Sequence, residues 1–299
     1  MERGLGQFAL WEAGRLLLGL VGAVLFAAAI SALSASTGTY ASTLVERLVA
    51  MFGGDFGPSV IGDVPAFGEV LRTFPATLEL LTLGLLIAFG VGIPVGMGLG
   101  SLRILRAAAP LIPIVAAVPV FCASLALVWF AVNILGWQDL GTTHRDLGAA
   151  LVAGNSAVAL EALRATVLPA VTVGMAGASA VQLVLRRAAS HAADQPYRRG
   201  LRLMGLSAFE IERLFVLPQM AAALLSGLGE ITLAMLSAAA IAEWVFAWPG
   251  AAVLFVKSVA LHDWNIVALV LMSFAWLTLI AQFLANLGTY MLTGTDPLP

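Results

Sequence analysis

Long stretches without Asp, Glu, Lys or Arg recur along the chain, separated by shorter segments that collect charged and turn-forming residues. A helix needs about 20 mostly apolar residues to cross the hydrocarbon core of a bilayer. A stretch from Leu214 to Ala242 is interrupted only by Glu230. Five others are uncharged, and they run from Leu16 to Val45, Leu80 to Leu102, Ala107 to Gln138, Ala165 to Leu185 and Trp264 to Thr295. We therefore expect an all-α integral membrane protein with six transmembrane helices.

The composition agrees with this pattern. Hydrophobic side chains make up 61% of the 299 residues and charged side chains 11%, whereas a soluble domain carries roughly 25% charged residues. The mean hydropathy of +0.98 exceeds what a buried core alone gives, because a soluble core needs a polar surface around it. The net charge of −2 excludes a basic surface for nucleic acid, and the single Cys122 excludes an internal disulfide or a cysteine zinc cluster.

Basic residues fall mainly on one side of the six stretches, and such residues concentrate in short cytoplasmic loops of membrane proteins. The richer side carries Arg3, Arg15, Arg103, Arg106, Arg186, Arg187, Arg198, Arg199, Arg202 and Arg213. The other side carries Arg47, Arg72, Arg145, Arg164 and Lys257. We therefore expect a single domain, 1–299, with both termini and a loop over 188–218 in the cytoplasm. External loops are expected over 45–75, with short surface helices, and over 137–164.

The first apolar stretch has a second interpretation as a secretory signal, because a short basic start precedes it and Ser34 and Ser36 follow. Removal of that stretch would leave an odd number of spans and would place the amino terminus outside. Its charge-free length favours a spanning helix.

Motifs for common catalytic chemistries are missing from the sequence. A phosphate-binding G-x-x-x-x-G-K-[ST] loop needs a lysine, and the only lysine, Lys257, lies outside any such motif. His144, His191 and His262 are scattered, so they form no H-E-x-x-H metal site, and no G-x-S-x-G occurs. We expect no catalytic residue, no metal site and no cofactor in this chain.

The second stretch combines glycines with a proline. Gly92 with Gly96, and Gly96 with Gly100, have the small-x-x-x-small spacing that lets two helix backbones approach closely in lipid. Pro94 removes a backbone hydrogen bond between them, which predicts a kink. These residues therefore either pack a helix contact or form a hinge.

The segment Ala188–Pro218 mixes basic and apolar residues. Ser207 and Glu210 have the spacing of a capping box, in which a hydroxyl and a carboxylate satisfy free amides at a helix start. We predict that one short helix ends near Gly205 and that another begins after it. Two interpretations of the basic face stay open: it contacts lipid headgroups, or it docks a cytoplasmic partner.

Gly205 is followed after nine residues by Phe215, Val216, Leu217 and Pro218, close to the pattern G-x9-I-x-L-P. With this spacing the segment resembles the cytoplasmic EAA loop of binding-protein-dependent ABC importer permeases. Other stretches are similar to the B-type subunit of the dipeptide, oligopeptide and nickel subgroup: Pro75–Leu80, Gly92–Gly96, Val118–Phe121, Leu168–Thr172, Glu243–Gly250 and Asp296–Pro297. The loop departs from the family pattern at Pro196, Gly200 and Met204, so its docking contacts are expected to differ in detail.

The resemblance implies a type I ABC importer fold and a permease in a bacterial cytoplasmic (inner) membrane. The implied partners are a homologous second permease subunit, two ABC ATPase subunits that bind ATP and Mg²⁺, and an external solute-binding protein. The implied solutes are di- or oligopeptides, with nickel or another small solute as the alternative. A membrane scaffold or sensor that conducts nothing is the alternative from another class.

The same resemblance implies a loop that couples the permease to an ATPase, with Gly205 allowing the sharp turn between two loop helices. The coupling residues would be Tyr197, Arg198, Arg199, Gly200, Leu201, Arg202, Gly205, Leu206, Ser207, Leu217 and Pro218.

Polar residues inside the apolar stretches are candidates for a translocation path. Glu230 lies near the middle of the fifth stretch, where a charged side chain costs about 2.5–3.5 kcal/mol on insertion scales. It therefore either faces the path, near a substrate amino group or a metal, or packs in a protonated or hydrogen-bonded form. Gln182 and Asn133 are further path candidates, and like Gln282 and Asn286 they either line the path or join helices.

Overall fold

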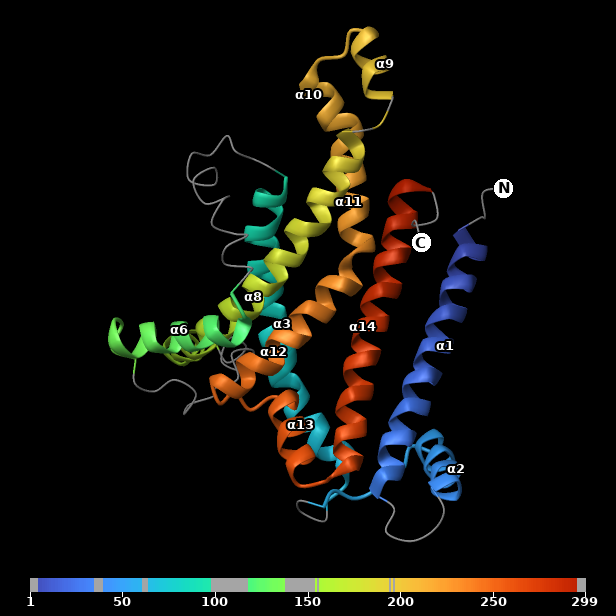
Figure 1. The fold of residues 1–299 in the computed structure, drawn as a ribbon, viewed down its shortest axis with the longest axis vertical. Helices are drawn as coiled ribbons and strands as arrows, with labels where there is room; N and C mark the ends of the chain where they lie inside the picture. The colour runs from blue at the N-terminus through green and yellow to red at the C-terminus, as the bar shows by residue number, and fades with distance from the viewer. Residues whose placement is uncertain are drawn as a thin grey trace.

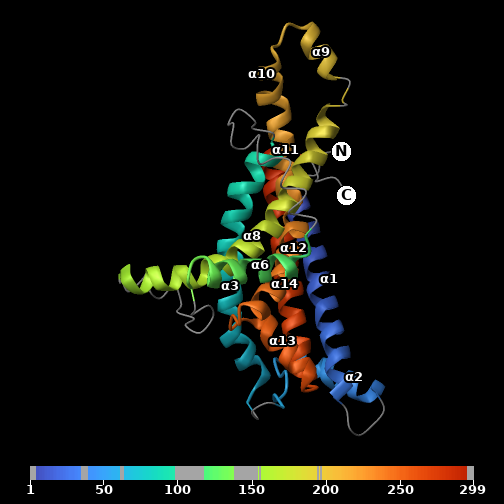
Figure 2. The same ribbon diagram turned by 60° about the vertical axis from the view of Figure 1, so that its left-hand side comes forward.

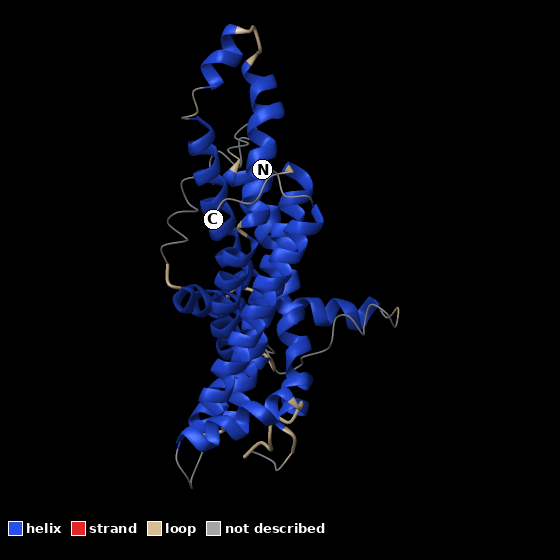
Figure 3. Cartoon of the chain, turned by 90° about the vertical axis from the view of Figure 1, so that its right-hand side faces the viewer, coloured by secondary structure: helices blue, strands red, loops and turns tan. Residues whose placement is uncertain are grey.

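The computed structural model describes residues 5–34, 40–60, 64–97, 118–137, 154, 156–193, 195 and 197–294. Within these ranges the regular elements are helices, and Figure 3 shows no strand among them. The helices form an elongated bundle in which the start of α1 and the end of α14 lie toward the same end (Figure 1). The helices are α1 (Leu5–Ser31), α2 (Tyr40–Phe52), α3 (Ala66–Gly96), α6 (Val120–Asn133), α8 (Ser156–Ala193), α9 (Tyr197–Leu203), α10 (Ala208–Ile211), α11 (Leu217–Ser226), α12 (Leu228–Val245), α13 (Ala251–Ala260) and α14 (Trp264–Thr293).

Among the described residues, five helices are long and apolar enough to cross a membrane, namely α1, α3, α8, α12 and α14. The predicted all-α membrane architecture is therefore confirmed. The third predicted stretch, Ala107–Gln138, is described only over 118–137, where the 14-residue α6 lies across the long axis of the bundle (Figure 1). The rest of that stretch lies outside the described residues.

Three spanning helices begin before the charged residues that limit the predicted stretches. α1 begins at Leu5 instead of Leu16, α3 at Ala66 instead of Leu80, and α8 at Ser156 instead of Ala165. At its other end, α1 stops at Ser31, short of the predicted Val45. Charges stay on these helices where a partner lies one turn away, as in the Arg15–Glu12 pair at 3.0 Å and the Arg72–Glu69 pair at 3.4 Å.

The same extension shortens both predicted external loops. The range 45–75 contains most of α2 and the first turns of α3, and the range 137–164 contains the first turns of α8. Residues 138–153 of the second loop lie outside the described residues.

The prediction of one helix over Leu214–Ala242 is wrong. A π-helical turn (Glu212–Val216) leads into α11. The helix is interrupted at Gly227, and α12 then runs at an angle to α11 (Figure 1). A window that counts charges misses this break, because glycine is uncharged and its low helix propensity is a weak signal. After α12 comes the short apolar helix α13, which no predicted stretch contains.

Glycines on α3 bring it against α8. A Cβ atom on Gly92 would lie 2.8 Å from the Cβ of Val181, and one on Gly96 would lie 2.9 Å from the Cβ of Leu185. Real side chains do not tolerate such distances, so the close approach of the two backbones depends on glycine. This is the packing environment that the spacing of Gly92 and Gly96 indicates.

The facing helix contributes glycines of its own to this contact. A Cβ atom on Gly174 of α8 would lie 2.6 Å from Ile87, and one on Gly177 would lie 2.7 Å from Ala88. α3 runs through Pro94 as far as Gly96, so a hinge at Pro94 stays a prediction, and Gly100 lies outside the described residues.

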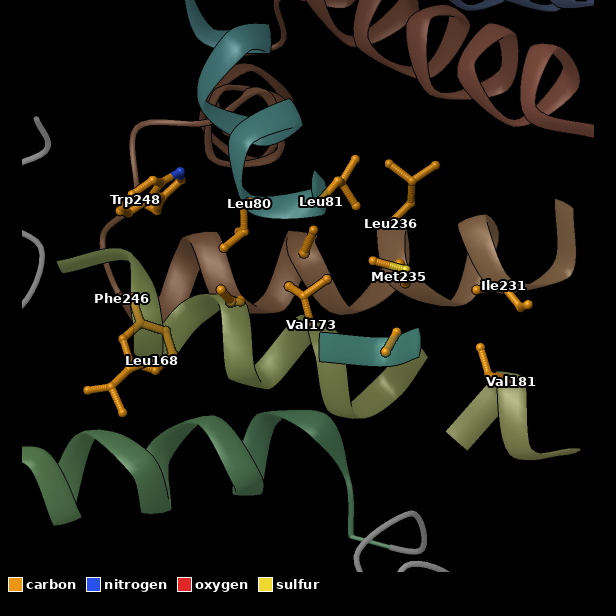
Figure 4. Packing of buried hydrophobic residues seen from close by; sticks show 14 of the residues in the cluster. Leu80, Leu81, Leu168, Val173, Val181, Ile231, Met235, Leu236, Phe246 and Trp248 are labelled. Carbon is orange, nitrogen blue, oxygen red and sulfur yellow. The ribbon is translucent and has the colours of Figure 1, made fainter. Parts of the chain in front are cut away.

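Two apolar clusters fill the interior of the bundle. The first lies mainly between α3, α8 and α12, where Leu80, Val173 and Met235 come together (Figure 4). The second joins α1 and α14 to parts of α3 and α13, with Ile266 and Val270 fully buried. In the bundle, α3, α8 and α12 lie on one side and the α1–α14 pair lies on the other (Figure 1).

Replacement of Gly92 by Leu is expected to destabilise the folded chain by about 1–3 kcal/mol, because the added side chain meets Val181 and the carbonyl of Ala178. Gly90→Leu is the matched control, since a Cβ atom at Gly90 has nothing within 4 Å. Thermal unfolding of both variants in detergent measures the difference. Equal midpoints for the two variants would show that the α3–α8 contact does not depend on glycine.

Candidate coupling loop and polar contacts of the bundle

A helical hairpin made of α9 and α10 projects beyond one end of the bundle (Figures 1 and 2). α9 ends in a Schellman turn, in which the Leu206 amide donates to the Leu201 carbonyl at 3.2 Å and the Gly205 amide donates to the Arg202 carbonyl at 3.0 Å. Gly205 has a φ of +91°. Glycine adopts this conformation without steric cost, whereas other residues are strained in it. The turn expected at Gly205 is therefore present.

A capping box starts α10, as the sequence predicts. The Glu210 amide donates to the Ser207 hydroxyl at 3.3 Å, and the Ser207 amide donates to the Glu210 carboxylate at 2.8 Å. The Ser207 hydroxyl also donates to that carboxylate, at 2.7 Å, and these hydrogen bonds lower the pKa of Glu210. Because the charged form is favoured, the box stays intact at neutral pH and weakens only as the pH falls through this lowered pKa.

Large apolar side chains are exposed at the tip of the hairpin. Leu203 is 89% exposed, Met204 77% and Phe209 72%. Arg199, Gly200 and Arg202 are exposed beside them, whereas Leu201 and Leu206 are partly buried. Tyr197 and Arg198 belong to α9, but their side chains lie outside the described part of the structure.

The second arm of the hairpin is continuous with the bundle. α10, the π-helical turn and α11 follow one another without a gap from Ala208 to Ser226. Pro218 is the second residue of α11, directly after the π-helical turn. Ile211 and Val216 are buried along this arm, while Leu217 and Pro218 are exposed. A force on the hairpin would therefore reach the bundle through a helical rod.

Glu230 does not lie in the middle of a helix, which corrects the sequence interpretation. It occupies the first turn of α12, because the helix is interrupted at Gly227, and its side chain is exposed. Its carboxylate lies 3.6 Å from the Nη1 atom of Arg187 on α8. The two side chains are 55% and 63% exposed, and a pair this open contributes at most about 1 kcal/mol.

The other two path candidates lie in different surroundings. Gln182 is buried on α8, and with its amide oxygen toward Arg186 it accepts a hydrogen bond from Nη2 at 2.9 Å. Asn133 is exposed on α6, and its amide donates to the Trp129 carbonyl within the same helix at 2.9 Å. Glu230 thus joins α12 to α8 through Arg187, while the hydrogen bond of Asn133 stays within α6.

The bundle contains a buried polar centre at Glu243, a residue that is not among the site residues predicted from the sequence. Its carboxylate is fully buried and accepts hydrogen bonds from the Thr77 hydroxyl at 2.6 Å, the Ala252 amide at 2.8 Å and the Val253 amide at 3.1 Å. These amides are the free donors at the start of α13, where the helix dipole favours an anion. A Cβ atom on Gly250 would overlap this carboxylate, so the approach needs glycine.

This centre joins α3, α12 and α13, and two side chains of the Pro75–Leu80 and Glu243–Gly250 stretches complete it. Thr77 also accepts from the Ala251 amide at 2.8 Å, and the indole of Trp248 donates to the Ala76 carbonyl at 3.0 Å. The signal in the sequence is a carboxylate inside an apolar helix, seven residues before a glycine, together with a distant threonine. Neither stretch alone identifies its partner.

Replacement of Thr77 by Val should destabilise the bundle, because the Glu243 carboxylate loses a donor and the buried Ala251 amide loses its acceptor. Each buried group left without a partner costs about 1–3 kcal/mol. Thr77→Ser keeps the hydroxyl and is the control. Thermal unfolding of both variants in detergent measures the difference. Equal stability of Thr77→Val and Thr77→Ser would show that the Thr77 hydroxyl does not stabilise the bundle.

Similarity to known proteins assigns this architecture to a family. Residues 73–289 match the family described as binding-protein-dependent transport system inner membrane component. The "Putrescine export system permease protein SapB" of Escherichia coli (strain K12) is 30% identical over 78% of each chain. The "Probable D,D-dipeptide transport system permease protein DdpB" of the same strain is 32% identical over 79% of this chain and 73% of its own. The "Di/tripeptide transport system permease protein DppB" of Pseudomonas aeruginosa (strain UCBPP-PA14) is 24% identical over 78% of this chain and 74% of its own. The chain therefore belongs to the family of binding-protein-dependent transport system inner membrane components, whose permeases have the type I ABC importer fold.

Proposed function

We propose that this chain is the permease subunit of an ATP-driven importer for peptides. The observation that carries the proposal is the α9–α10 hairpin, which projects from the bundle and exposes Leu203, Met204 and Phe209. Exposed apolar patches of this kind mark contact sites for other proteins. A partner ATPase that receives this hairpin in a groove would cover these side chains.

The proposed partners are two ATPase subunits, a homologous second permease subunit and an external solute-binding protein. ATP and Mg²⁺ bind to the ATPases, and this chain supplies no catalytic group and needs no cofactor. Closure of the ATPases moves the hairpin, and α11 carries that movement into the bundle, so that the path opens alternately to each side. Gly205 and the capping box keep the two loop helices at a fixed angle during this movement.

The chain is a multi-pass inner membrane protein. For its orientation, we propose that the hairpin end of the bundle faces the cytoplasm. The start of α1 and the end of α14 lie toward that same end (Figure 1), so both termini would be cytoplasmic. The excess of arginines on this side of the sequence supports the same orientation.

Peptides are the proposed solutes because two of the relatives are named for D,D-dipeptide and di/tripeptide transport. Another relative is named for putrescine export in one strain and for peptide transport in a second strain. Putrescine, a small polyamine, is therefore a second candidate solute, beside nickel. Peptides and polyamines share a protonated amino group, which a carboxylate in the path could bind.

Replacement of Gly205 by Trp is expected to abolish ATP-dependent uptake of a labelled short-peptide mixture into proteoliposomes with the assembled transporter. A tryptophan at position 205 would be strained in the left-handed backbone conformation of the turn, which sets the angle between α9 and α10. Gly205→Asn is the control, because asparagine tolerates left-handed angles better than other side chains, and it should retain most uptake.

The wild-type transporter in the same assay separates the candidate functions. Stimulated ATP hydrolysis without peptide uptake would redirect the proposal to putrescine or nickel. Absence of both activities would favour a scaffold or sensor. Full uptake with Gly205→Trp would contradict coupling through this loop.

We further propose that Glu230 binds the substrate ammonium group in the path, with Arg187 as its partner between transport cycles. Glu230→Gln should then raise the KM for uptake while transporter assembly stays unchanged, because it removes the charge and keeps the size. Glu69→Gln is the matched control, since the Glu69 carboxylate also pairs with an exposed arginine, at 3.4 Å from the Nη1 atom of Arg72. An unchanged KM for Glu230→Gln would remove Glu230 from the path.

A further inference from the structure

The break between α11 and α12 is completed by a side chain from another helix. In a continuous helix, the Gly229 amide would donate to residue 225 and the Ser226 carbonyl would accept from residue 230. Instead, the Gly229 amide donates to Oε1 of Gln282 at 3.1 Å, and Nε2 of Gln282 donates to the Ser226 carbonyl at 3.1 Å. One amide side chain of α14 thus bonds the last turn of α11 and the first turn of α12.

Two glycines let neighbouring helices reach this break. A Cβ atom on Gly229 would overlap the Gln282 side chain, and one on Gly227 would lie 3.0 Å from a methyl group of Val184 on α8. The break is therefore packed between α14 and α8. Gly227 itself has a φ of −81° and a ψ of −2°, so a rotation of about 40° in ψ at this one residue would bring it to helical values and straighten α11 and α12 into one helix.

The hydrogen bonds continue from Gln282 to α1. The second Nε2 hydrogen of Gln282 bonds Oδ1 of Asn286 at 2.6 Å, and Nδ2 of Asn286 donates to the Glu12 carboxylate at 3.1 Å. Arg15 donates to the other oxygen of Glu12 at 3.0 Å. Glu12 and Asn286 are buried, so each needs these partners.

Other contacts hold α1 against α14 along much of their length. The rings of Phe8 and Tyr290 stack with their centroids 4.2 Å apart, and the indole of Trp276 donates to the Leu20 carbonyl at 3.3 Å. α1 and α14 therefore form one firm pair, which holds Gln282 in place through the Asn286 amide. Both hydrogens of the Gln282 amide and its oxygen have a partner in this arrangement.

We infer that Gln282 is a positioning residue for transport, which keeps the break between α11 and α12 as the pivot on which movement of the loop becomes movement of α12. This inference rests on the proposed function. With the free backbone groups bonded to a side chain, α11 and α12 can change their angle without breaking helical hydrogen bonds. Without Gln282, those groups would find partners only if α11 and α12 merged into one straight helix, which would remove the pivot.

The experiment uses the whole transporter in proteoliposomes and measures solute imported per ATP hydrolysed. Gln282→Met has nearly the same shape and removes all three hydrogen bonds. Thr278→Val is the matched control, because Thr278 lies one turn away on α14 and its hydroxyl donates to the carbonyl of Phe274 in its own helix, at 3.0 Å. We expect Gln282→Met to hydrolyse ATP while solute per ATP falls about tenfold, and Thr278→Val to match the wild type.

A merely structural role would lower the amount of assembled transporter without changing solute per ATP for the transporter that remains. A wild-type ratio in Gln282→Met, or an equal loss in Thr278→Val, would therefore overturn the inference. Gly229→Ala approaches the same contact from α12, because its methyl group displaces the Gln282 amide. If Gln282→Met does not assemble, a wild-type ratio in Gly229→Ala overturns the inference in its place.

The wild-type transporter separates this inference from the function on which it rests. Absence of solute uptake in the wild type would contradict the proposed function. Normal wild-type uptake with normal coupling in the variants would contradict only the role of Gln282.

Discussion

A polar group inside a bilayer must find its partner inside the protein, and this constraint sets the contacts between the helices of this chain. Glu243 on α12 bonds the start of α13 and a hydroxyl of α3. Asp263 caps α14 and accepts from the Ser59 hydroxyl and the Val60 amide, so it fastens the segment before α3 to the start of α14. Gln282 bonds the break between α11 and α12. Each of these side chains joins elements that the apolar surfaces alone would leave free to slide.

These contacts divide the bundle into two groups of helices. Glycines pack α3 against α8, and the Glu243 centre adds α12 and α13 to that group. The second group is the α1–α14 pair, held by the Phe8–Tyr290 stack and by the link from Glu12 to Asn286. The hairpin is attached to the first group through α11, and Gln282 of the second group lies against the joint. The proposed change of angle between α11 and α12 at this joint would therefore move the hairpin relative to the α1–α14 pair.

The predictions from sequence succeeded where the determining contacts are local. Ser207 and Glu210 are three residues apart, so their spacing alone identified the capping box, and Gly205 next to it identified the turn. The predictions failed where the partner is distant in sequence. Glu243 and Thr77 are 166 residues apart, and Gly229 and Gln282 are 53 apart. The sequence around Glu243 or Gly229 therefore does not show which distant residue supplies its hydrogen-bond partner. Helix ends were misplaced for a second reason, because Glu12 and Arg15 neutralise each other on α1 and do not end it.

The most direct test of the two-group account is a pair of spin-label distances in the assembled transporter, measured with and without ATP. One pair joins exposed Leu214, in the π-helical turn below the hairpin tip, to exposed Met291 on α14, and the other joins exposed Trp244 on α12 to exposed Phe67 on α3. We predict that ATP changes the Leu214–Met291 distance and leaves the Trp244–Phe67 distance unchanged. A constant Leu214–Met291 distance, or a change between Trp244 and Phe67, would contradict the division into two groups.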